Sequence, residues 1–174
     1  KKENQEKKGQ ALCDEAMDAF RRGDMGEAKR LATIALKTQS DKGRPAGILT
    51  AVMMQGEQKA AQNYINMGLT RTSEESYRLY LLAAQSIIHQ QWEKALEQST
   101  EALKADVTNE LASLAIADLQ LVRGRKVTAF FTFWHILDHR WSNQILTDTM
   151  LGCLKNVSTK EFDERLLEGA KKYL

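Results

Sequence analysis

Residues 90–109 have the sequence QQWEKALEQSTEALKADVTN. In this stretch the small residues Ala95, Ser99 and Ala102 are separated by steps of four and then three positions. Residues three and four apart lie on one face of an α-helix, so the stretch predicts a helix with one face of small side chains. Because such a face allows a second helix to approach closely, the pattern favours a pair of packed helices.

The same ladder of spacings recurs along the chain at a nearly constant interval. The ladders begin at Ala28, Ala61, Ala95 and Ala129. These starts are 33, 34 and 34 positions apart. Five positions before the starts stand Gly23, Gly56, Gln90 and Gly124. Glycine adopts the left-handed conformation that ends many helices, so we expect a turn at this offset. A period of this length predicts stacked units of two antiparallel helices each.

With this period, and with WEKALEQSTEALKAD at residues 92–106, the chain resembles the tetratricopeptide repeat (TPR) family. The resemblance implies an all-α fold, a right-handed superhelical array of antiparallel helical hairpins (a TPR-like α-solenoid). We expect about four degenerate repeats and a C-terminal helical pair, within a single domain of residues 1–174. The expected repeats cover residues 9–41, 42–75, 76–109 and 110–142, and the expected pair covers residues 143–174.

The composition limits the classes of partner. The chain has 174 residues, with 25 Lys and Arg against 23 Asp and Glu. Because the two signs of charge nearly balance, the sequence does not show the basic surface that nucleic-acid binding requires.

No apolar run reaches the roughly 18 residues of a membrane span. Since the chain begins at Lys1 without Met, we expect a fragment or a processed chain. We expect it in the cytoplasm, or on the cytoplasmic side of a membrane-anchored protein whose membrane contact lies outside this chain.

The sequence carries no recognisable catalytic motif. It lacks a phosphate-binding glycine loop, GxSxG, HExxH and a calcium loop, so we expect no enzyme activity and no cofactor. His135 and His139 have a spacing that can hold a metal on one helix face, but they lack a third ligand, and we expect no metal site. Cys13 and Cys153 are expected as reduced thiols in the core.

The family resemblance also suggests where a partner would bind. In that family the first helices of successive repeats line a concave groove. The positions that correspond to this groove are Met17, Phe20, Arg21, Thr50, Met53, Met54, Tyr77, Tyr80, Ile87, Leu111, Leu114 and Asp118. This set is apolar and rich in Met, and it predicts an amphipathic helix or an extended apolar segment of another protein as the partner. The alternative is that several of these side chains form the core between repeats.

An aromatic segment, FFTFWHILDHRW at residues 130–141, falls in the second helix of the fourth expected repeat. One interpretation is that its rings fill the joint between this repeat and the C-terminal helices. The other is a second interface, with the residues Phe130, Phe131, Trp134 and Trp141.

These observations leave three hypotheses for the function. The first is a non-catalytic scaffold or adaptor that holds a partner segment, by family analogy in a bacterial secretion or envelope/polysaccharide-export assembly. The second is the helical-repeat domain of a larger enzyme, such as a glycosyltransferase. The third is a self-associating assembly module, because an uncapped array of repeats tends to stack on itself.

Overall fold

The computed structural model describes residues 2–171, and in this range the chain forms ten helices and no strand. The predicted all-α class is therefore confirmed. The helices are α1 (Lys2–Arg21), α2 (Met25–Thr38), α3 (Gly43–Met54), α4 (Gln58–Leu69), α5 (Glu75–Ile88), α6 (Trp92–Ala105), α7 (Glu110–Val122), α8 (Lys126–Ile136), α9 (Gln144–Gly152) and α10 (Thr159–Lys171).

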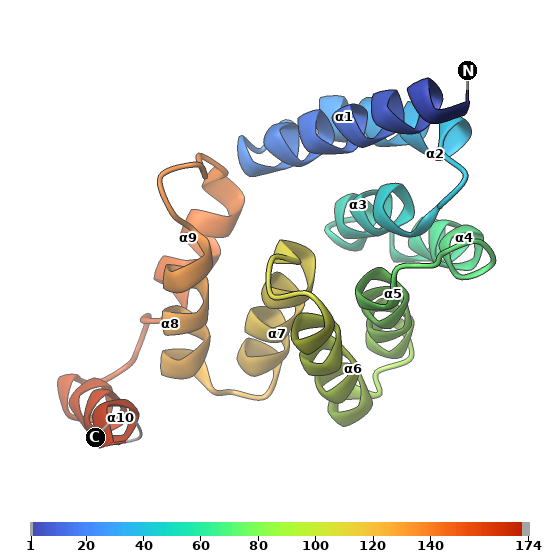
Figure 1. The fold of residues 1–174 in the computed structure, drawn as a ribbon. Coiled ribbons are helices and arrows are strands. Elements are labelled where there is room, and N and C mark those ends of the chain that lie inside the picture. The colour runs from blue at the N-terminus through green and yellow to red at the C-terminus, as the bar shows by residue number, and fades with distance from the viewer. Residues whose placement is uncertain (1, 172–174) are drawn as a thin grey trace.

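Consecutive helices from α1 to α9 pack against each other. The closest pairs are α1 with α2, α3 with α4, α5 with α6, and α7 with α8. The odd-numbered helices α1, α3, α5 and α7 also contact one another in order, and α3 reaches α7. Figure 1 shows the path of the chain as a curve from α1 (blue) to α9 (orange), with α10 (red) at the far end. None of the helices between residues 2 and 171 has both the length and the hydrophobicity that crossing a membrane requires.

The predicted ladders lie in the second helix of each of the four pairs. The residues at the ladder positions, of which Ala28 is the first, are buried. The exception is the last position, Ile136, which is partly exposed. The reason for small residues is clearest at Gly68 of α4. A Cβ atom at this position would lie 2.8 Å from the Cβ of Ala46 and 2.5 Å from a methyl of Leu81. The backbone of α4 therefore lies directly against both α3 and α5.

A turn lies at all four predicted positions, and three of them adopt the left-handed conformation. Gly23 and Gly124 have positive φ angles of 80° and 73°, and Gln90 adopts the same left-handed conformation at 57°. Gly56 is the exception: its φ angle is not positive, and α3, which ends at Met54, continues through a right-handed Gln55. There the N–H groups of Gly56 and Glu57 both donate to the carbonyl of Met53, which satisfies the helix end without a left-handed residue.

Two buried asparagines, Asn109 and Asn143, begin α7 and α9 and lie 34 positions apart. Each is only 1% exposed, and each side-chain oxygen accepts the N–H three residues on, as an N-cap does. The Asn109 amide donates to Ser76 Oγ at 2.9 Å. The Asn143 amide donates to the carbonyl of Phe20, also at 2.9 Å. These side chains therefore fix a helix start and also join it to a distant part of the chain.

The structure corrects the expected course of residues 126–142. Helix α8 ends at Ile136, so His139 and Trp141 lie in the following loop and not on the helix. Trp141 packs edge-on against Phe20 of α1, with ring centroids 6.1 Å apart, and the Ser142 N–H donates to the carbonyl of Arg21. We call this contact between residues 20–21 and 141–143 the closing contact. The helix ends early because the closing contact takes the loop away from the helix axis.

The expected C-terminal helical pair is present as two helices, but they are not packed together. In the described part of the chain α10 contacts α8 and not α9. Its Phe162 ring lies 6.4 Å from that of Phe130 and 5.5 Å from that of Phe131. The predicted joint between α8 and a C-terminal helix is therefore formed, and α10 forms it.

Candidate functional site

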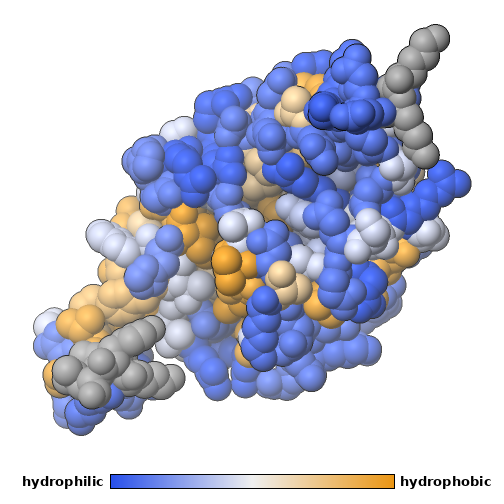
Figure 2. Space-filling view, viewed as in Figure 1, coloured by the Kyte–Doolittle hydropathy of each residue, from blue (hydrophilic) through white to orange (hydrophobic). Residues whose placement is uncertain are grey.

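Two hollows open on the face that the odd-numbered helices line, which we call the inner face. The smaller, about 200 Å³, lies among the C-terminal halves of α1, α3 and α5, the helix α7 and the start of α9. We call it the apolar hollow. The larger, about 420 Å³, lies toward the start of α3, α5 and α7, and we call it the polar hollow. Leu111 lines both, so the two hollows are adjacent. Figure 2 shows hydrophobic residues gathered between hydrophilic ones near the middle of one face of the molecule.

The apolar hollow brings together most of the side chains that the sequence predicted for a groove. Its predicted members are Phe20, Met54, Tyr80, Ile87, Leu111, Leu114 and Asp118. Ala51, Ala84, Ala115 and Leu146 complete its apolar wall, and Gln55 and Gln58 lie at its edge. Phe20, Tyr80, Leu111 and Leu114 are buried, so they form the wall and also belong to the core. These residues therefore line a surface hollow and also belong to the core, and a role in binding a partner stays a prediction.

The other predicted groove residues lie elsewhere. Met17, Arg21 and Tyr77 line the polar hollow. Thr50 and Met53 line neither hollow and are buried in the core. They are placed there because α3 is covered on several sides, by α2, α4, α5, α1 and α7. The structure thus removes Thr50 and Met53 from the surface that a partner could touch.

The polar hollow differs from the apolar groove that the sequence predicted. Its described lining includes two guanidinium groups, Arg21 and Arg44, and six carboxylates: Glu6, Asp14, Asp41, Glu74, Asp106 and Glu110. Asp41, Glu74, Asp106 and Glu110 stand at or just before the starts of α3, α5 and α7. Acidic residues are common there because they complement the helix dipole and cap N–H groups. The sequence gives no signal for this site, because its carboxylates occupy the positions of ordinary helix-capping residues.

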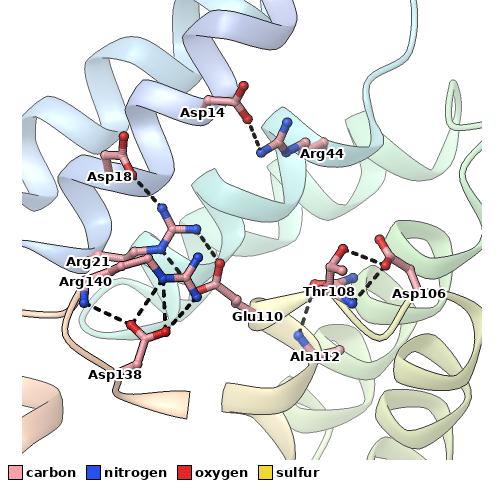
Figure 3. A network of polar contacts seen from close by, with 11 residues as sticks. Asp14, Asp18, Arg21, Arg44, Asp106, Thr108, Glu110, Ala112, Asp138 and Arg140 are labelled. Atoms are coloured by element: carbon pink, nitrogen blue, oxygen red, sulfur yellow. Dashed lines mark hydrogen bonds and ion pairs between the residues drawn. The ribbon is translucent and has the colours of Figure 1, made fainter.

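Arg21 joins α1 to α7 at the edge of the polar hollow, as Figure 3 shows. Its guanidinium donates through Nε to Glu110 at 3.1 Å and forms a second hydrogen bond to the other oxygen of that carboxylate. A third bond, 2.6 Å long, goes to Asp18. The side chains of Arg21 and Glu110 are only 13% and 19% exposed. The charge of Arg21 is therefore already neutralised within the chain.

The remaining groups of the polar hollow differ in how well they are paired. Arg44 forms an ion pair of 2.6 Å with Asp14. Burial works to raise the pKa of Asp41, but hydrogen bonds from Ser73 and Gly43 outweigh it and lower that pKa. Glu74 has no ion pair or hydrogen bond to its carboxylate among the described residues, and burial, together with the nearby Asp41 and Asp106, raises its pKa. Glu74 is thus the unpaired carboxylate of this hollow.

Asp118 is the one charged side chain among the described residues that line the apolar hollow. Asp118 is an exposed residue, and partial burial of its carboxylate beside the apolar side chains of the hollow raises its pKa to about 6. Within residues 2–171 it has no hydrogen bond and no ion pair. An unpaired carboxylate in apolar surroundings is unfavourable, and its energy falls when a cation or a hydrogen-bond donor approaches it.

The aromatic residues predicted as a second interface separate into two places. Phe130, Phe131 and Trp134 form one cluster with Phe162 of α10, and the Phe130 ring lies 5.8 Å from that of Trp134. Trp134 is 61% exposed. Trp141 lies at the closing contact instead, where the Arg21 guanidinium is 5.9 Å from its ring centre. Trp141 was grouped with Phe130, Phe131 and Trp134 because it is close to them in the sequence, but in the structure it does not belong to their cluster.

Residues of metal-ligand types and two cysteines occur in the described chain. No three His, Cys, Asp or Glu side chains within it form a group that could hold a metal ion. Cys13 and Cys153 are both buried and unpaired with each other. Burial raises the pKa of the Cys13 thiol to about 11, and it also raises the pKa of Cys153. Both cysteines are therefore protonated at neutral pH and are poor nucleophiles.

No family model matches the chain, and no curated protein matches it at a significant level.

Proposed function

We propose that this chain is a non-catalytic interaction module that holds a segment of a partner protein along its inner face. One observation carries this proposal. Seven of the residues predicted for a groove, from α1, α3, α5 and α7, line a single apolar hollow that is open to solvent. Apolar side chains around a concave surface, with a few polar groups, are typical of sites that bind an apolar or amphipathic segment.

The finer parts of this proposal rest on the repeat pattern of the sequence. We propose that the helix pairs stack as a TPR-like, right-handed superhelical array, and that the module serves as a scaffold or adaptor. A cytoplasmic location and a role in a secretion or envelope assembly belong to the same proposal, by family analogy. The buried ladders and the left-handed turns at Gly23, Gln90 and Gly124 support the arrangement in repeats.

A peptide selection tests the proposal. Random dodecapeptides displayed on phage are selected against the purified chain, and the enriched peptides are measured by fluorescence anisotropy. The Met54→Glu variant places a charge in the apolar hollow and is expected to weaken binding about tenfold or more. The control, Met67→Glu, makes the same change at an exposed position of α4 that lines neither hollow, and is expected to bind like wild type.

Circular dichroism shows whether each variant keeps its helices. The proposal is wrong if no peptide is enriched over an unrelated helical protein. It is also wrong if a well-folded Met54→Glu variant binds the enriched peptides as tightly as the wild-type chain.

A second candidate function, self-association, is favoured by the end of the chain. Besides Trp134, the side chains of Leu151, Leu166 and Leu167 are at least half exposed on α9 and α10. Figure 2 shows hydrophobic residues along this end. Clustered exposed apolar side chains often mark contacts between proteins. We expect light scattering across a dilution series to show dimers that Leu167→Glu dissociates. A monomer at every concentration would exclude this function.

A further inference from the structure

We propose that the apolar hollow binds a lysine or arginine side chain of the partner segment, with Asp118 as its counter-ion. This inference rests on the proposed function, because it names the chemistry of the segment that the inner face holds. It goes beyond the apolar segment expected from the sequence, since it requires a positive charge next to apolar residues. It also assigns to Asp118 the role of selecting that charge.

The shape and lining of the hollow fit such a side chain. Its volume of about 200 Å³ lies below the roughly 300 to 1,000 Å³ of most sites for small molecules. It therefore suits one or two side chains better than a cofactor. Lys and Arg carry a long apolar stem that ends in a charged group. The stem can pack against Met54, Ile87 and Leu114, while the charged group reaches Asp118.

The charge of Asp118 is not balanced by its surroundings. Among the described residues, the titratable groups that interact with it are Tyr80 of α5 and Cys153 at the end of α9, and Lys126 of α8 interacts with Cys153. Burial raises the pKa of Tyr80 and that of Cys153 above their usual values, so both are neutral near pH 7. The other polar side chains at the hollow, Gln55 and Gln58, carry no charge. Asp118 therefore sets the sign of the potential in the apolar hollow.

The neighbouring polar hollow adds to the same preference. Its described carboxylates outnumber its guanidinium groups, and Glu74 is unpaired there. The two hollows meet at Leu111, so a segment that runs from one into the other passes two unpaired carboxylates in turn. A surface of one sign draws partners of the opposite sign and disfavours those of the same sign. Acidic segments are accordingly excluded.

The ionisation of Asp118 makes the binding dependent on pH. With its pKa raised to about 6, the carboxylate is charged at neutral pH and mostly protonated near pH 5. Only the charged form can pair with a cation, so binding strengthens as the pH rises through about 6. A hydrogen bond to a charged group that is lost in this way corresponds to an affinity change of about tenfold or more.

The experiment uses the dodecapeptides selected from the random library as probes. The strongest is compared with a copy in which each Lys becomes norleucine and each Arg becomes citrulline. We expect enrichment of Lys or Arg next to apolar residues, and about tenfold weaker binding of the uncharged copy. Asp118→Asn keeps the shape of the side chain and is expected to remove most of the difference between the two peptides and most of its change between about pH 5 and about pH 7.5.

The matched control is Asp163→Asn, which makes the same change at an exposed carboxylate of α10 outside both hollows. It is expected to bind like wild type. If it weakens binding as much as Asp118→Asn, the effect is one of total charge and the inference is wrong. Enriched peptides without Lys or Arg, or equal binding of the uncharged copy, would also overturn it. In those cases a loss of peptide binding on Met54→Glu would still support the proposed function. A selection that enriches no peptide would overturn both the proposed function and this inference.

Discussion

The Asn143→Ala variant is expected to lower the free energy of unfolding by about 2 to 4 kcal/mol. The side chain has two tasks that alanine cannot perform. Its oxygen caps α9, and the loss of such a cap costs about 1 kcal/mol. Its amide donates to the carbonyl of Phe20, and removing the donor leaves this buried acceptor unpaired, which costs a further 1 to 3 kcal/mol or so. Unfolding in urea, followed by circular dichroism, measures the loss.

Two further variants separate these tasks. Asn143→Ser keeps an oxygen that can cap α9 but loses the bond to Phe20, so we expect an intermediate loss. Asn63→Ala removes an exposed asparagine of α4 that has no such bonds, and it should stay within about 0.5 kcal/mol of wild type. A loss on Asn143→Ala no larger than that on Asn63→Ala would mean that the closing contact does not form in solution.

The Gly68→Ala variant is expected to lose about 1 to 3 kcal/mol, the usual cost of overfilling a packed core. Alanine is the better helix former, so an unhindered site would show the opposite sign. Here the added methyl group would meet the Cβ of Ala46, which cannot move aside without a shift of α3. The midpoint of urea unfolding gives the sign directly.

Gly56→Ala is the matched control for this prediction. Gly56 has no other atom within 4 Å of the position of a Cβ, and its φ angle is not positive. The same exchange there should leave stability unchanged or raise it slightly. A gain at Gly68 comparable to that at Gly56 would show that α4 does not lie against α3 and α5 as described.

The fold could be predicted where it depends on local spacing. The ladder at Ala28, Ala61, Ala95 and Ala129 marks the buried face of the second helices because the periodicity of a helix and the burial of small residues are both local properties. The prediction failed at Trp141 and at the end of α8, where a partner 121 positions away, Phe20, decides the conformation. Nothing in the residues near Trp141 indicates that partner.

The candidate site was predicted in part for the same reason. The register of the repeats identifies which helix faces point inward, and it therefore located Met54, Ile87 and Asp118 at the apolar hollow. It could not indicate that Asp118 lacks a partner, which depends on what every neighbouring helix presents to it. The polar hollow was missed because Glu74 and Asp106 have the positions of ordinary helix-capping residues, and only the packing of helix starts shows that they converge.

The closing contact has a consequence for how the molecule opens. In a chain whose helices touch only their neighbours, either end can unravel and re-form while the rest stays intact. Here the hydrogen bond between Asn143 and Phe20 spans 123 positions, so α1 cannot leave without breaking the contact that holds the start of α9. The segment from α1 to α9 is therefore bound into one cooperative unit. Helix α10, which in the described chain contacts α8 alone, stands outside it and can detach by itself at low cost.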